Sequence, residues 1–174
     1  MRILGGPRHN SAKSLPPPKE LFAQYPMGIR YLLFLHWIGW VTGQGGPWFD
    51  KTPYYQEQGR IENILVERNG KGIQLEKAGR LDAAIKLYEQ NVVDCADTPH
   101  PYDRLRVIYT QRKQYDDAIR VCKAYIQLEK QLAEATKKEM GAKEWDPTRL
   151  ALKVAGFTRW AEKLEDMRKA KAGS

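Results

Sequence analysis

The sequence predicts an all-α protein, and three observations support that prediction. From residue 61 onward, apolar residues recur at steps of three and four, which is the period of an amphipathic helix. The pattern of small, apolar and charged residues at positions 79–85 recurs at positions 113–119. The 174 residues are 42% hydrophobic and 29% charged, so the chain has enough apolar surface to fold around a core. Together these features predict two pairs of helices that follow one another at a fixed period.

The net charge of +8 is not concentrated in the helical middle of the chain. Residues 1–60 carry +4, residues 61–127 carry +1 and residues 128–174 carry +3. A protein that binds nucleic acid usually gathers Lys and Arg on one face or stripe. The mixed signs favour an ordinary solvated surface, and association with nucleic acid through the basic flanks stays open as an alternative.

Residues 1–26 are expected to form a flexible arm rich in Pro and Gly. Three consecutive prolines from Pro16 to Pro18 favour an extended chain. A signal peptide would place an apolar core near the start, whereas this region is polar and proline-rich. Two Cys residues are too few for a disulfide scaffold. We therefore expect a cytoplasmic protein.

Residues 27–60 form an apolar and aromatic segment. Its apolar run, residues 31–41, has eleven residues, whereas a spanning helix needs about 20. Integral membrane insertion is therefore not expected. Three interpretations remain open: a buried core element, an interfacial anchor within residues 29–41, and an exposed strip that docks a partner. Residues 43–59 are expected to be a turn-rich loop that packs back on the core. The strip consists of Phe34, Trp37, Trp40 and Trp48.

The middle region, residues 61–127, divides into two helix pairs. In the first pair one helix ends at Gly79, because glycine is the residue most often found at a helix C-terminal cap. The next helix covers residues 81–92, with its charged residues on the face opposite the apolar stripe. Residues 98–101 contain two prolines and break the chain before the second pair begins.

Equivalent positions of the two pairs recur at one constant spacing. Ala84 matches Ala118, and Tyr88 matches Cys122. This spacing and pattern resemble the tetratricopeptide repeat, a helix–turn–helix unit of about 34 residues. The resemblance implies that the two alanines let helices approach closely, and that Tyr88 and Cys122 fill the space between neighbouring units. The glycine that the family has at the turn is present in the first unit and replaced by Lys113 in the second.

Residues 128–174 do not continue the repeat. Asp146 and Pro147 are typical of a helix start and predict a capping helix, followed by a frayed tail over residues 169–174. A stack of two units is short, so the missing burial is expected from the capping helix, the aromatic N-terminal segment or a second copy of the chain. The last helix of the second pair is expected to run on through Leu128, Leu132 and Ala135.

The sequence shows no pattern typical of catalysis or metal binding. It lacks the nucleophile elbow of hydrolases, the phosphate-binding loop and the paired-histidine zinc motif. Cys95 and Cys122 are expected to be a loop thiol and a core thiol rather than a redox pair. No cofactor, no metal and no enzymatic activity are therefore expected.

The resemblance implies a concave groove, lined by the first helix of each unit, that binds a protein partner as a peptide or a helix. Lys77 and Arg104 are expected to bind a carboxylate there, and reversing both charges is expected to weaken binding without lowering the melting temperature. The sequence thus predicts a non-catalytic adaptor or scaffold, with an ordinary solvated surface as the alternative interpretation of the same residues. The groove residues are Asn69, Ile73, Glu76, Lys77, Asp103, Arg104, Val107, Thr110 and Gln111.

Overall fold

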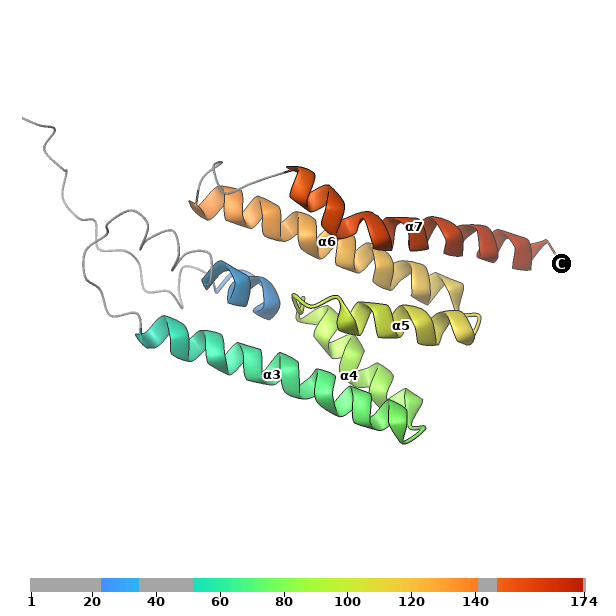
Figure 1. Ribbon diagram of the computed structural model, residues 1–174, viewed down its shortest axis with the longest axis horizontal. Coiled ribbons are helices and arrows are strands. Elements are labelled where there is room, and N and C mark those ends of the chain that lie inside the picture. Colours follow the sequence, from blue (N-terminus) through green and yellow to red (C-terminus); the bar gives the residue numbers. More distant parts are fainter. Residues whose placement is uncertain (1–22, 35–51, 141–146, 174) are drawn as a thin grey trace, which may run out of the picture.

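The computed structural model describes residues 23–34, 52–140 and 147–173 (Figure 1). Every regular element within these ranges is an α-helix, so the predicted all-α class is confirmed. A short helical segment, residues 27–34, precedes five further helices. These are α3 (Thr52–Lys77), α4 (Leu81–Val93), α5 (His100–Gln111), α6 (Tyr115–Met140) and α7 (Pro147–Ala172).

Helix α3 begins at Thr52, so the second half of the loop expected over residues 43–59 is helical, and that prediction is wrong there. A tertiary contact stabilises the first turns. The buried carboxylate of Glu57 pairs with Arg60 at 2.8 Å and with Arg30 of the short N-terminal segment at 3.6 Å. Because Arg30 is distant in sequence, the local pattern of apolar residues carries no sign of this contact.

Three helix ends adopt the same left-handed turn. Gly79, Cys95 and Lys113 have φ angles of 70°, 55° and 58°. After Gly79 the amide of Arg80 donates to the carbonyl of Leu75 at 2.8 Å, and the equivalent bonds close the other two turns at 2.8 and 2.9 Å. The predicted cap at Gly79 is confirmed, and Lys113 repeats its geometry at the equivalent position of the second pair without a glycine.

Consecutive helices pack against one another (Figure 1), and side-chain contacts join alternate helices into two layers. Arg104 joins α5 to α3 through an ion pair with Glu76, and Arg106 joins α5 to α7 by stacking on Trp160. In the other layer, Arg120 of α6 pairs with a carboxylate of α4. The layer of α3, α5 and α7 is therefore backed by the layer of α4 and α6.

The core between these layers contains the small and large residues that the repeat pattern singles out. Close helix packing requires small side chains at some positions, and larger side chains then fill the space between neighbouring pairs. Two residues of α7, Ala161 and Leu164, belong to the same cluster, so the last helix closes the stack. The fully buried members include Ala84, Tyr88, Ala118, Cys122 and Leu164.

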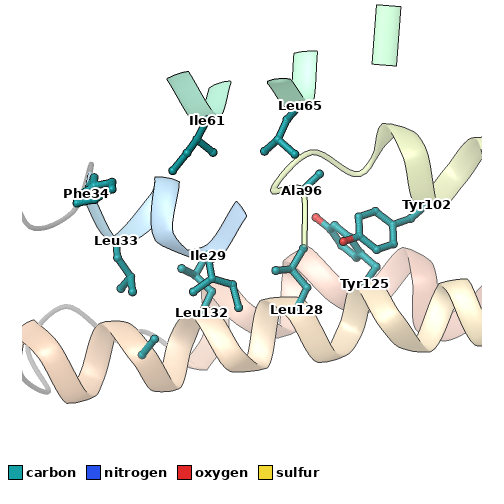
Figure 2. Packing of buried hydrophobic residues seen from close by; sticks show 11 residues of the cluster. Ile29, Leu33, Phe34, Ile61, Leu65, Ala96, Tyr102, Tyr125, Leu128 and Leu132 are labelled. Atoms are coloured by element: carbon teal, nitrogen blue, oxygen red, sulfur yellow. The ribbon is translucent and has the colours of Figure 1, made fainter. Parts of the chain in front are cut away.

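The short helical segment lies between the N-terminal half of α3 and the C-terminal half of α6 (Figure 2). Ile29, Leu33 and Phe34 are each exposed by 1% or less. The described part of the apolar run is therefore a buried core element, which was one of the three interpretations. Among the described helices, none has the combination of length and apolar character that crossing a bilayer requires. On either side of the segment lie Ile61 and Leu65 of α3 and Leu128 and Leu132 of α6.

Gly28 holds this segment close to the turn after α4. Its amide donates to the carbonyl of Asp94 at 2.7 Å. A Cβ atom at Gly28 would lie 1.7 Å from the carbonyl oxygen of Cys95, a distance that no side chain can occupy. The absence of a side chain at Gly28 therefore permits the segment to dock.

Helices α6 and α7 have the extents that the sequence predicts, except at the end of the chain. Helix α7 continues to Ala172, so the tail expected over residues 169–174 is helical in its first four residues, and that prediction is wrong. The ammonium of Lys171 donates to the carbonyl of Lys113 at 3.3 Å and lies 5.8 Å from the ring of Tyr115. These contacts hold the last turn of α7 against the start of α6.

Candidate functional site

The nine predicted groove residues divide between α3 and α5, which are neighbours in one layer. Ile73 and Val107 are half-buried, whereas Lys77 and Gln111 are exposed. Helical spacing places residues three and four apart on one face, so the members on each helix share a side of it. The surface formed by α3, α5 and α7 is called here the α3–α5–α7 face.

An ion pair between Glu76 and Arg104 lies on this face. The Nε atom of Arg104 donates to the two carboxylate oxygens of Glu76 at 3.1 and 3.2 Å, and Nη2 adds a further bond. The hydroxyl of Tyr88 donates to the same carboxylate at 2.6 Å. Hydrogen bonding from Arg104 holds the pKa of Glu76 below its usual value, in spite of partial burial. Burial and the bond to Glu76 raise the pKa of Tyr88.

This geometry corrects one expectation from the sequence. Arg104 was predicted to bind a partner's carboxylate, but its guanidinium is already bound to Glu76. Reversing its charge would place two carboxylates against each other between α3 and α5, which destabilises the folded state. We therefore revise the expectation from the sequence and predict that reversing the charge of Arg104 lowers the melting temperature. Lys77 is exposed and is better suited to test binding.

A second charged group links α5 to α7. The guanidinium of Arg106 is buried, with 9% of its side chain exposed, and donates to the carboxylate of Asp103 at 2.6 and 3.1 Å. It also lies 4.0 Å from the ring centroid of Trp160, a cation–π contact. The ammonium of Lys163, one turn further along α7, lies 4.8 Å from the same ring.

Trp160 and Lys163 were not among the predicted site residues. The sequence predicted that α7 caps the stack, and both residues lie on this helix. The spacing of Trp160 and Lys163 shows that they share a helix face. Because α7 lies outside the register of the two repeated units, no local signal places that face beside α5.

Two further groove residues are occupied by bonds within the chain. The side-chain amide of Asn91 donates to the Oδ1 atom of Asn69 at 2.9 Å. The hydroxyl of Thr110 donates to the carbonyl of Arg106 at 2.7 Å. The structure therefore brings the predicted residues of α3 and α5 together, and leaves Lys77 and Gln111 as the exposed polar groups among them.

The predicted docking strip is described only in part. Phe34 is fully buried in the cluster between α3 and α6, so it is not offered to a partner. Trp37, Trp40 and Trp48 lie outside the described residues.

Both cysteines lie in the described part of the chain. Cys95 is half-buried in the turn after α4, and Cys122 is buried; both are free thiols. Burial raises the pKa of the Cys122 thiol to about 11 and also raises that of Cys95. No group of His, Cys, Asp and Glu with the geometry of a metal site occurs among the residues that the structure describes.

Comparisons with protein-family models, with curated proteins and with solved structures gave no match.

Proposed function

We propose that this chain is a non-catalytic interaction protein that binds a peptide or a helix of a protein partner on the α3–α5–α7 face. The observation that supports the proposal most directly is the composition of that face. Half-buried apolar groups, Ile73, Val107 and Trp160, lie on the same layer as the exposed groups Lys77 and Gln111. Apolar area supplies affinity, and polar groups beside it fix the orientation of a bound chain.

The proposal includes a tetratricopeptide-like pattern for the two units, with which the recurrence of local structure agrees. The left-handed turns at Gly79 and Lys113 occupy equivalent positions of the two units and join helices of the two layers. Each unit then contributes one helix to the α3–α5–α7 face. A repeat of this kind builds a continuous surface from equivalent helices, which is how such stacks bind extended partners.

The opposite layer is a poorer candidate. Two of its basic residues are bound within the protein: Arg120 pairs with Glu89 of α4, and Lys123 pairs with Glu165 of α7. Surface ion pairs of this kind solvate a protein and provide little recognition. The interfacial-membrane alternative is also weakened, because Ile29 and Leu33, at the start of the segment it needs, are already packed inside the protein.

Copurification from a lysate of the source organism tests the proposal. The bait variant is Lys77→Glu with Gln111→Glu, and the matched control is Lys86→Glu with Gln127→Glu in the other layer. All four side chains are exposed, so both variants are expected to keep the melting temperature of the native chain.

A defined protein partner should be retained by the native chain and the control, and lost from the bait variant. Recovery of the same proteins by both variants would remove the α3–α5–α7 face as the binding surface. Nuclease treatment before the experiment separates protein partners from those held through nucleic acid.

A further inference from the structure

The most informative group on the α3–α5–α7 face is the one around Trp160. Arg106 is a buried cation whose hydrogen bonds are directed to Asp103, and its flat guanidinium stacks on the indole ring. The ring is thereby held in a fixed position on α7 by a residue of α5. Trp160 remains half-exposed, and no described residue accepts a hydrogen bond from its indole N–H.

The carboxylates named on this face are paired, whereas one lysine is not paired within the described residues, and an unpaired lysine favours the binding of an anion. Glu76 and Asp103 are each neutralised by a guanidinium, from Arg104 and Arg106 respectively. Lys163 is exposed, lies 4.8 Å from the ring centroid of Trp160, and has no carboxylate partner among the residues that the structure describes. Two donors, an indole N–H and an ammonium, are therefore adjacent and available on α7.

We infer that Trp160 and Lys163 form an anion-binding subsite that takes an Asp or Glu side chain of a partner peptide, with an apolar side chain of the same peptide against the indole. The inference rests on the proposed function, since it names the chemistry of the partner at that face. A carboxylate accepts bonds from both donors, and Arg106 prevents the ring from turning away. The subsite lies on α7, beyond the two repeated units.

Selection of peptides from a displayed library of random dodecapeptides tests the inference. The native full-length chain is the target, and the selected peptides are then measured by fluorescence anisotropy. The test variants are Lys163→Glu and Trp160→Phe, which keeps an aromatic ring and removes the N–H donor. Lys86→Glu on α4 is the matched control, because it changes the net charge by the same amount in the other layer.

The selected peptides should be enriched in Asp and Glu next to aliphatic or aromatic residues. Lys163→Glu should weaken their binding about fivefold, Trp160→Phe about threefold, and Lys86→Glu not measurably. Added salt should weaken binding to the native chain more than binding to Lys163→Glu.

Three results would count against the inference, and they can be told apart. The selected peptides could lack acidic enrichment, or their affinity could be unchanged by Lys163→Glu and reduced by Lys77→Glu with Gln111→Glu. Either result would remove the subsite and leave the proposed function standing. Failure to select any peptide that binds the native chain would count against the proposed function itself. Binding of oligodeoxythymidylate with the same dependence on Lys163, in place of acidic peptides, would assign the cations to nucleic acid and also overturn the inference.

Discussion

Gly72 has no room for a side chain, whereas Gly70 has ample room. A Cβ atom at Gly72 would lie 2.5 Å from the ring of Tyr88, and a Cβ at Gly70 would meet nothing within 4 Å. Tyr88 cannot retreat, because it is fully buried and its hydroxyl is bound to Glu76. Two glycines in the same helix therefore have opposite roles.

Gly72→Ala should lower the free energy of unfolding by about 2 kcal/mol, because the added methyl overpacks the contact with Tyr88. Gly70→Ala should raise it by up to about 1 kcal/mol, because alanine is the better helix former at an open position. Urea unfolding of both variants measures the two changes. Equal shifts in the same direction would show that Gly72 and Tyr88 are not in the contact described.

The ion pair of Glu76 predicts a pH dependence of stability. The pKa of this carboxyl is lowered in the folded state, from a reference value of 4.5, chiefly by hydrogen bonding from Arg104. The ion pair therefore contributes fully to the free energy of unfolding above the unfolded-state pKa of Glu76. This contribution is lost as pH falls through the lower folded-state pKa. Glu76→Gln should reduce the loss of stability on acidification across that range.

Denaturant unfolding at pH values on either side of this range provides the measurement. Glu162→Gln, which removes an exposed carboxyl of α7, is the matched control and should leave the acid dependence close to that of the native chain. An unchanged acid dependence in Glu76→Gln would mean that the pair with Arg104 does not form in solution.

At the scale of elements, the helix ends give a matched comparison. Gly79 and Lys113 occupy equivalent left-handed turns, but only glycine adopts that conformation without steric cost. Gly79→Ala should lower the free energy of unfolding by about 1 kcal/mol, and Lys113→Gly should raise it by about 0.5–1 kcal/mol. Thermal unfolding of the two variants measures whether each change in stability has the expected direction. If Lys113→Gly is less stable than the native chain, the side chain of Lys113 stabilises the folded state by more than its left-handed backbone destabilises it.

Some helix boundaries follow from local sequence and others depend on distant contacts. The cap at Gly79 and the start of α7 at Pro147 are visible in the sequence, because glycine and proline act on their own backbone. The start of α3 was missed, although Thr52 followed by Pro53 is a pair typical of a helix start. The repeat predicted a turn at Lys113, but the left-handed conformation there and at Cys95 was not visible, because neither residue favours a positive φ.

At the scale of the whole molecule, the short stack gains burial from both ends. Helices α3 and α6 are twice as long as α4 and α5, at 26 residues against 13 and 12. The helical segment of residues 27–34 fills the space between the long helices, and α7 covers the far side of α6 (Figure 1). The sequence indicated that burial was missing and named both of these sources, but its periodicity could not say where either would pack.

The sequence predicted which helices carry the candidate site, but not the side-chain contacts within it. The period of the repeat was sufficient to bring the groove residues of α3 and α5 onto neighbouring helices. It could not foresee that Glu76 and Asp103 are neutralised by Arg104 and Arg106, since ion pairs depend on side-chain geometry between helices. Nor could it place Trp160, which reaches α5 only through the packing of α7.

The central claim is that the α3–α5–α7 face binds the partner, and site-specific photo-crosslinking tests it most directly. A benzophenone amino acid is placed either at Gln111 of α5 or at Gln127 of α6, both exposed glutamines in different layers. Irradiation in the presence of the copurifying partner or a selected peptide should give an adduct from position 111 and little from position 127. An adduct from position 127 alone would contradict it and place the binding surface on the opposite layer.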